Sequence, residues 1–401
     1  MLAPTLDELL GSDHFVRRLL PLVEGALGED LRRVCNDRGG YRHDPVGLFC
    51  VWTYGFLQGE ASSRKLEEKC RYDARYAFLC SGTTPDHSTL SRFRDSLSDV
   101  LDALLARLAL EAQRAGLLGS RPLALDGTKV PASSTQWRRA LDRSREEDAA
   151  FLRRPNGDGL FGYNVQAMTD LGSGYAAAYA VTSAANDAPG AEAALAALEA
   201  QSPVRPDAVV ADKGFDAPEV YEAIESRGMV AVVAQKGARR HFLSLGDDGV
   251  YRCPAGHEPR VRDALQDGKP VRVWQVSRCS GCAFGRSCGA SGRQKRAVMP
   301  VGVLPGHRRA WQASAESESG RRLLRARAPS IERLFGTLKG TMGLRRFKLR
   351  HAKGARLEFG LAILAYNLRM LAKELRRKLF RLLGRREPII GNTRIELVQS
   401  H

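Results

Sequence analysis

Three acidic residues lie in separate parts of the chain, each in sequence surroundings that suit a metal site. Asp126 closes an apolar run from Pro122, and Asp212 closes a second run from Ala208. Such runs predict buried strands, whereas Glu332 lies in a segment with helical periodicity. Carboxylates from two strand ends and a helix could hold two divalent cations. Because two cations can stabilise both the attacking and the leaving oxygen of a phosphodiester, the pattern suits metal-dependent DNA cutting and joining.

Each acidic residue also has an ordinary interpretation. Asp close before Gly is often only a turn, and this applies to Asp126 and to Asp212. Glu332 could be a solvated helix residue. Lys339 follows Glu332 by about two helical turns, so both can project from one helix face. The Lys339 ammonium could then bind a phosphate beside the cations, although a single lysine is more often an ordinary surface residue.

The charge of the chain indicates a polyanionic partner. The sequence has 401 residues, a formal net charge of +17 and a pI near 9.8. An excess of this size is typical of nucleic-acid-binding proteins, although charge alone does not exclude other basic proteins. The sequence shows neither a signal peptide nor an apolar stretch long enough to span a bilayer. We therefore expect a cytoplasmic protein that acts on DNA and not at a membrane.

The eight cysteines fall into two groups. Four are scattered through helical sequence and are expected to be reduced core residues: Cys35, Cys50, Cys70 and Cys80. The other four cluster in a loop-rich segment: Cys253, Cys279, Cys282 and Cys288. A Cys-x2-Cys pair in a reducing compartment favours zinc, and four thiolates would complete a structural site, with His257 as a spare ligand. An iron–sulfur cluster and a set of free thiols are the alternatives.

The chain divides into four predicted segments. Residues 1–115 have helical periodicity and predict an all-helical N-terminal domain for DNA binding and dimerisation, with a helix start at Asp44-Pro45. Residues 116–236 alternate strand and helix signals, which predicts an α/β sheet with functional residues beyond its strand ends. Residues 237–315 interrupt this pattern as a cysteine-containing insert. Residues 316–401 return to long helices and a basic tail.

The three carboxylate motifs resemble those of bacterial DDE-type insertion-sequence transposases. The similarity is greatest to the broad group around the IS four and IS five elements, in particular the IS eleven-eighty-two branch. Three motifs carry it: Asp126–Lys129, Ala211–Phe215 and Ile331–Lys339. Further segments agree with it: Asp44-Pro45, Ser63–Glu67, Pro85–Arg94 and Asn367–Leu371. The resemblance covers about residues 12 to 375.

The resemblance implies an RNase H-like (retroviral-integrase-like) catalytic core. The first Asp would lie on the first strand, the second after the fourth strand, and the Glu on a late helix. Asp126, Asp212 and Glu332 would bind Mg²⁺ or Mn²⁺, and Lys339 would be a further catalytic residue. In related transposases an insert falls between the fifth strand and the Glu helix, where this chain has its cysteines.

One position departs from the family pattern. The family usually has an Arg four positions before the Glu, and this chain has Ala328 there. The phosphate contact of that Arg is therefore missing, or Arg325 or Arg327 replaces it. Contacts to DNA are expected from seven basic residues: Arg92, Arg94, Lys129, Arg325, Arg327, Arg333 and Lys339.

These features predict a bacterial transposase that binds the terminal inverted repeats of an insertion sequence and catalyses strand cleavage and strand transfer. Its partners would be double-stranded DNA, as transposon ends and target, and a second copy of the chain. A transposase-derived structure-specific nuclease is one alternative, and an assay of strand transfer would separate it. A catalytically inactive DNA-binding repressor is the other, and the intact carboxylates argue against it.

Overall fold

The computed structural model describes eleven parts of the chain. They are residues 5–36, 43–133, 146–153, 159–235, 243–246, 250–266, 269–277, 279, 281–283, 295–300 and 305–383. The basic tail beyond residue 383 and Cys288 therefore lie outside the described residues.

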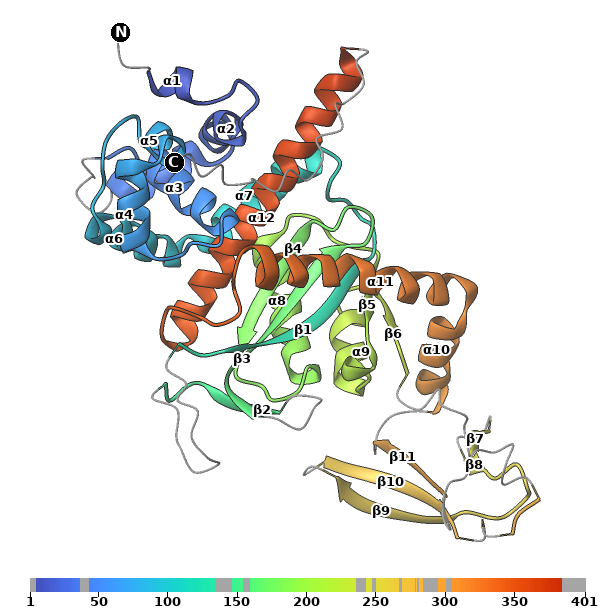
Figure 1. Ribbon diagram of the computed structural model, residues 1–401. Coiled ribbons are helices and arrows are strands. Elements are labelled where there is room, and N and C mark those ends of the chain that lie inside the picture. Colours follow the sequence, from blue (N-terminus) through green and yellow to red (C-terminus); the bar gives the residue numbers. More distant parts are fainter. Residues whose placement is uncertain are drawn as a thin grey trace.

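The N-terminal part is helical (Figure 1). Its helices are α1 (Leu6–Leu9), α2 (Phe15–Asn36), α3 (Pro45–Leu57), α4 (Ser63–Tyr72), α5 (Ala74–Leu79), α6 (His87–Ser96), the 3₁₀ turn η1 (Leu97–Asp99) and α7 (Leu101–Arg114). The predicted start of α3 is confirmed: Asp44 is the N-cap, its carboxylate accepts from the Gly47 N–H at 3.0 Å, and Pro45 is the first helical residue. Because α3 is buried along almost its whole length, it forms the centre of this helical group.

A mixed six-stranded sheet follows. Its strands are β1 (Leu123–Pro131), β2 (Ala150–Arg153), β3 (Gly159–Asp170), β4 (Ala176–Thr182), β5 (Ala208–Ala211) and β6 (Val230–Val233). The order is β2-β3-β1-β5-β6, and β4 also pairs with β3. Strands β1, β5 and β6 run parallel, while β3 is antiparallel to its neighbours. The prediction of an α/β sheet is confirmed, and β3 and β4 form an antiparallel hairpin within it.

The prediction that Asp126 ends its strand is wrong. Strand β1 continues to Pro131, because its antiparallel pairing with β3 extends to the pair Pro131↔Gly162. Its parallel pairing with β5, however, ends at Leu125↔Ala211. Asp126 is therefore the first residue beyond the β1–β5 ladder, although it lies within a strand. The prediction that Asp212 follows its strand is confirmed, since β5 ends at Ala211.

Helices cover both faces of the sheet (Figure 1). One face carries α8 (Ala191–Gln201), which follows the 3₁₀ turn η2 (Ala188–Gly190), and α9 (Pro218–Glu225), which follows η3 (Lys213–Phe215). The other face carries α11 (Glu318–Gly336), which crosses β1, β3, β5 and β6 and continues into a π-helical turn, η4 (Thr337–Thr341). The long helix α12 (His351–Leu382) joins β4 to the N-terminal helices α2, α3 and α7.

The segment 237–315 contains more regular structure than its composition predicts. It has a hairpin of β7 (Ser244–Leu245) and β8 (Tyr251–Arg252), and an antiparallel sheet of β9 (Arg260–Gln266), β10 (Lys269–Val276) and β11 (Lys295–Pro300). Helices resume at α10 (Pro305–Glu316), earlier than the predicted position near Glu316. These strands carry many charged residues, so their alternation of apolar and polar positions is weak.

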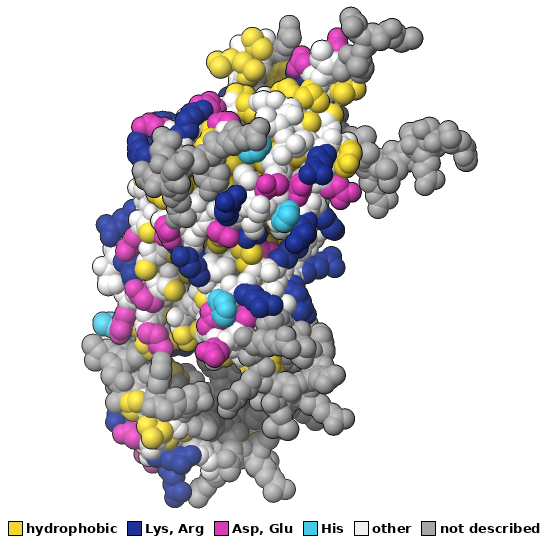
Figure 2. Space-filling model, turned by 90° about the vertical axis from the view of Figure 1, so that its left-hand side faces the viewer, with side chains coloured by type: hydrophobic (Ala, Val, Ile, Leu, Met, Phe, Trp, Pro, Cys, Tyr) yellow, Lys and Arg dark blue, Asp and Glu magenta, His cyan; other side chains and the backbone are white. Residues whose placement is uncertain are grey.

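Two surface properties bear on partners. None of the described helices is long and apolar enough to cross a membrane. Figure 2 shows one face of the molecule, on which Lys and Arg side chains (dark blue) lie among acidic ones and gather along one edge. Among the described residues of this face, basic side chains are therefore mixed with acidic ones and are most frequent along that edge.

Two buried amides close the outer edge of β4. The Asn367 side chain of α12 accepts from the Ala176 N–H at 3.1 Å and donates to the Ala176 carbonyl at 2.8 Å. Gln201 of α8 accepts from the Tyr179 N–H at 2.9 Å and donates to its carbonyl at 3.1 Å. These amides satisfy backbone groups that an edge strand would otherwise leave unpaired.

We expect Asn367→Ala to lower the free energy of unfolding by about 2–4 kcal/mol, because it leaves two buried backbone groups without partners. Urea unfolding followed by circular dichroism measures this difference. Lys373→Ala, at an exposed position of the same helix, should change stability little. Equal stabilities for the two variants would contradict this account of the β4 edge.

Candidate active site

The structure brings Asp126 and Asp212 to neighbouring positions. They are the residues that directly follow the last β1–β5 register pair, Leu125↔Ala211. Adjacent strands of a sheet are about 5 Å apart, so two side chains that follow one register pair are neighbours. The negative charge of Asp212 is one cause that raises the pKa of Asp126. The two predicted carboxylates therefore lie in one electrostatic environment.

The Asp126 carboxylate is largely buried and has two hydrogen-bond partners. Its Oδ1 accepts from the Gly127 N–H at 2.8 Å, and its Oδ2 forms an ion pair with the Arg327 guanidinium at 2.9 Å. Burial raises the pKa of Asp126, and the Arg327 charge and hydrogen bonds oppose this only in part. A further positive charge beside Asp126 would therefore favour the ionised carboxylate.

Arg327 is the arginine that reaches the carboxylate site. Its guanidinium projects from α11 onto Asp126. Arg325 is exposed, and it donates instead to the Arg321 carbonyl of its own helix at 3.3 Å. Position 328, where the family pattern places its Arg, is a half-buried alanine. Of the two candidates for the missing arginine, only Arg327 makes a contact with a predicted catalytic carboxylate in the described part of the chain.

A buried hydroxyl pair sets the rotation of α11. Ser330 Oγ lies 2.9 Å from Thr169 Oγ1 on β3 and 3.2 Å from the Asp170 carbonyl. Ile331 and Leu334 are buried beside it. This orientation turns Arg327 toward the sheet and leaves Glu332 exposed. Within the described residues, no three Asp, Glu, His or Cys side chains gather closely enough to hold one metal ion, so Glu332 is not joined to the aspartates.

Lys339 lies in the π-helical turn η4 and faces the same strand. Its ammonium donates to Thr128 Oγ1 and contacts the Lys129 carbonyl at 3.4 Å. Thr128 and Asp126 are two residues apart in β1, so their side chains lie on the same face of the sheet. Lys339 therefore lies against the strand that carries Asp126, whereas Glu332, two helical turns earlier, is exposed, and the role of both stays a prediction. Single π-helical turns are frequent at functional sites because they redirect one side chain within a helix.

The remaining basic residues have varied surroundings. Arg92 and Arg333 are exposed. Arg94 is mostly covered, since it pairs with Asp95 at 2.8 Å and lies over the Trp52 ring at 5.3 Å. Arg92 and Arg333 are thus better placed than Arg94 for a contact with DNA.

The donor atoms of Asp126 and Asp212 suit Mg²⁺ or Mn²⁺, which prefer hard oxygen ligands. Arg327 already provides a positive partner for one of these oxygens. Asp187, which the sequence patterns do not single out, packs against the glycines that follow both aspartates. It lies in the turn before α8 and not at a strand end, so no period or motif marks it.

The cysteine segment is placed in part. Cys253 and Cys279 are buried in one small cluster with Leu243, Trp274 and Val276. Each begins a turn, closed by the Gly256 N–H to the Cys253 carbonyl at 2.9 Å and by the Cys282 N–H to the Cys279 carbonyl at 3.5 Å. Cys282 is half-buried. Two of the four predicted ligands thus share a cluster, but the three described cysteines of this segment do not gather closely enough to hold one metal ion, and zinc stays a prediction.

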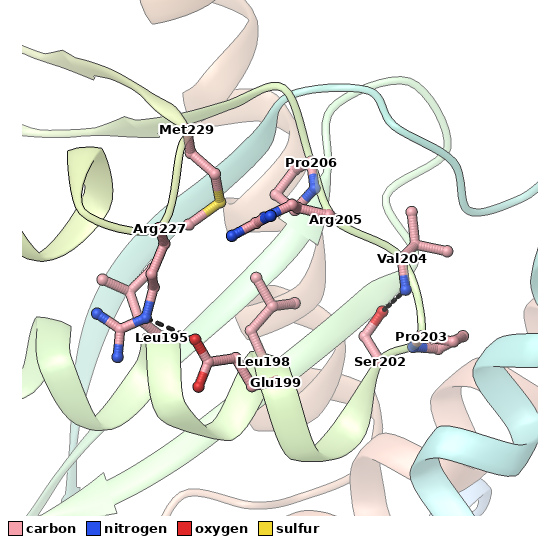
Figure 3. A pocket seen from close by; sticks show the side chains of 10 residues that line it. All are labelled: Leu195, Leu198, Glu199, Ser202, Pro203, Val204, Arg205, Pro206, Arg227 and Met229. Atoms are coloured by element: carbon pink, nitrogen blue, oxygen red, sulfur yellow. Dashed lines mark hydrogen bonds and ion pairs between the residues drawn. The ribbon is translucent and has the colours of Figure 1, made fainter.

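A pocket of about 220 Å³ lies away from the carboxylates (Figure 3). Leu195 and Leu198 of α8, Val204 and Met229 line it, and Arg227 donates to Glu199 at 2.8 Å along its edge. It lies at the beginnings of β5 and β6, whereas Asp212 follows the end of β5. This pocket is therefore separate from the candidate active site.

Comparisons with known proteins agree with the resemblance seen in the sequence. The sequence profile described as Transposase DDE domain matches residues 118–368, and the one described as Transposase domain (DUF772) matches residues 4–96. No curated protein matches the sequence. Among solved structures, a cryo-EM structure of the piggyBac transposase synaptic complex with hairpin DNA aligns over 93% of this chain and 84% of its own, with 10% identity. Its TM-score is 0.29, too low to support a conclusion.

The Arg327–Asp126 pair generates a prediction about pH. Because the guanidinium stabilises the ionised carboxylate, Arg327→Ala should raise the pKa of Asp126 further above its ordinary value. Asp126 would then stay protonated to a higher pH. A carbon-13 NMR titration of the Asp126 carboxyl in metal-free protein measures this. The matched control is Arg325→Ala, which should leave the titration unchanged. An unchanged or lowered pKa in Arg327→Ala would disprove the assignment.

Proposed function

This chain belongs to the family of DDE-type insertion-sequence transposases, and from that premise we propose how it acts on DNA. We propose that it binds the terminal inverted repeats of its element and catalyses strand cleavage and strand transfer through Asp126, Asp212 and Glu332. The observation that supports this most is the position of the two aspartates, directly after the register pair Leu125↔Ala211.

We propose an RNase H-like core for residues 116–236 and 316–401. The strand order β4-β3-β1-β5-β6, with β3 antiparallel, supports this assignment. When the short strand β2 is not counted, Asp126 lies on the first strand of the sheet and Asp212 follows the fourth strand, β5. This is the order that the resemblance implies. Glu332 lies on α11, after the insert. The order of the three carboxylates along the fold therefore supports their assignment as one site.

Asp126 and Asp212 would hold Mg²⁺ or Mn²⁺, and Glu332 would complete the ligands once α11 presents it. When bound, the cations would activate the nucleophile and stabilise the leaving oxygen. Arg327 would orient Asp126 and favour its ionised form, as their 2.9 Å ion pair supports. Lys339, anchored beside Thr128, would bind the phosphate next to the scissile bond. The protein thus supplies charge and position, and no covalent protein–DNA intermediate is needed.

DNA outside the active site would contact the other basic residues. The helices within residues 1–115 would recognise the terminal repeats and support a homodimer. Arg92 on α6 is exposed there, as this role requires. Lys129, Arg325 and Arg333 would contact the backbone near the carboxylates. Phosphate contacts by Lys and Arg displace counterions, so binding should weaken as salt rises.

The triad assignment gives a direct test. Asp126→Asn, Asp212→Asn and Glu332→Gln should each abolish cleavage of a duplex that carries the element's end, because a neutral amide weakens cation binding. Binding to the same duplex, measured by fluorescence anisotropy in Ca²⁺, should remain. Glu318→Gln, on the exposed first turn of α11, is the control and should cleave normally. Strong cleavage by any triad variant in Mg²⁺ would remove that residue from the site. Cleavage without strand transfer into a plasmid would indicate a nuclease.

We also propose a structural zinc ion on Cys253, Cys279, Cys282 and Cys288. The shared cluster of Cys253 and Cys279 supports this, as do the turns that follow both. Those turns contain Gly256 and Gly281, both at φ +75°, a conformation that glycine adopts without strain.

Purified protein should contain close to one zinc per chain, because thiolate ligation couples metal binding to folding of the segment. Cys279→Ser and Cys282→Ser should lose the zinc, while Cys50→Ala, in the buried helix α3, should keep it. Elemental analysis of protein purified without chelator measures this. Iron with sulfide would favour a cluster, and no metal would leave free thiols.

A further inference from the structure

The carboxylate of Asp187 lies between two glycines that come shortly after the proposed metal ligands, Gly127 in β1 and Gly214 in the 3₁₀ turn η3. A Cβ atom added to Gly127 would lie 2.3 Å from Asp187 Oδ1. One added to Gly214 would lie 3.1 Å from Asp187 Oδ2. The two oxygens of one carboxylate thus pack against a glycine of β1 and a glycine of the turn that follows β5. Only residues without a side chain allow this approach at Gly127, because real Cβ atoms do not come so close.

The same two glycines orient the proposed ligands. The Gly127 N–H donates to Asp126 Oδ1 at 2.8 Å, and the Gly214 N–H donates to Asp212 Oδ1 at 2.7 Å. Asp187 therefore contacts the peptide units that hold both carboxylates. Removal of the Asp187 carboxylate would leave space beside both glycines.

Asp187 is itself held in place from the sheet. The Asn164 side chain donates to Asp187 Oδ1 at 3.0 Å, and Asn164 is completely buried on β3. The Asp187 carbonyl accepts from the Gly190 N–H at 2.9 Å, which starts the turn before α8. The carboxylate is thus fixed at its side chain and at its backbone.

Asp187 and the Asp126 side chain lie on different sides of β1, whereas the carboxylates of Asp187 and Asp212 both border Gly214. Successive strand residues point to opposite faces of a sheet, so the Cβ position of Gly127 is opposite to the Asp126 side chain. Asp187 occupies the space at Gly127, on the face that carries α8. It supports the strands from behind the site.

We propose that Asp187 is a positioning residue that sets the separation of the β1 backbone at Asp126 from the turn after Asp212 and so sets the affinity for the divalent cation. This inference rests on the proposed function of the two aspartates. Residues that orient metal ligands without touching the metal typically change affinity or activity by about 10–100-fold.

The test is Mn²⁺ binding to full-length protein without DNA, followed by electron paramagnetic resonance. Asp187→Ala should bind Mn²⁺ about 10–100-fold more weakly. Asp187→Asn keeps the shape and should lose less. Gly127→Ala should also weaken binding, because its methyl group would displace the Asp187 carboxylate. The control for Asp187→Ala is Asp207→Ala, at an exposed position. The control for Gly127→Ala is Gly119→Ala, because a Cβ atom added there has no neighbouring atom within 4 Å.

The double variant Gly127→Ala/Asp187→Ala separates positioning from general damage. In Asp187→Ala there is room for the methyl group at position 127. Adding Gly127→Ala to Asp187→Ala should therefore lower the Mn²⁺ affinity little further. If the fold-loss of Mn²⁺ affinity in the double variant equals the product of the two single fold-losses, the two residues act independently. That result would overturn the proposal. High Mn²⁺ should restore cleavage in Asp187→Ala but not in Asp126→Asn. Melting temperatures show whether Asp187→Ala is folded. If it is not, the Mn²⁺ affinity of Asp187→Asn tests the proposal instead.

The outcomes distinguish this inference from the proposed function. Asp126→Asn and Asp212→Asn are titrated alongside. If these two bind Mn²⁺ as the wild type does, the metal site itself is wrong. If they lose Mn²⁺ while Asp187→Ala binds normally, the metal site stands and the positioning role of Asp187 is wrong.

Discussion

The parallel pairing of β1 with β5 is the constraint on which the candidate active site depends. It ends at Leu125↔Ala211, so it places two acidic residues side by side in partly buried surroundings. Burial and the charge of Asp212 both disfavour the ionised form of Asp126. The structure offsets this with one guanidinium, from Arg327, and with one backbone N–H for each aspartate. A cation bound beside these two side chains would favour the ionised carboxylates.

Helix α11 supplies the cationic side chains at fixed positions. Ser330 binds the hydroxyl of Thr169 and so sets the rotation of the helix on the sheet. That rotation selects Arg327 for the contact with Asp126 and leaves Glu332 exposed. The π-helical turn then directs Lys339 back to β1. In the proposed mechanism, Glu332 joins the aspartates only when cations attract it.

The opposite face of the sheet has a supporting role. Asp187 fills the space beneath Gly127 and Gly214, and Gln201 and Asn367 satisfy the free edge of β4. Buried polar groups of this kind are costly unless they are paired, so they restrict the strands to one arrangement. The rigidity of the site thus comes from both faces, although the proposed chemistry takes place on one.

The sequence by itself determined the α/β class of the core and the start of α3, and it singled out the three carboxylates that we propose as the catalytic site. Each rests on local information, such as an apolar run, a helical period or a capping pair, which acts through neighbours in the chain. It was wrong about the end of β1, because the length of that strand depends on its partner β3. It did not reveal the small sheet of the insert, whose strands alternate weakly. Only the tertiary structure decided that Arg327, and not Arg325, meets Asp126, and that Asp187 lies behind both aspartates. Those contacts join residues far apart in the chain, and their geometry depends on helix rotation and strand register, which no local pattern contains.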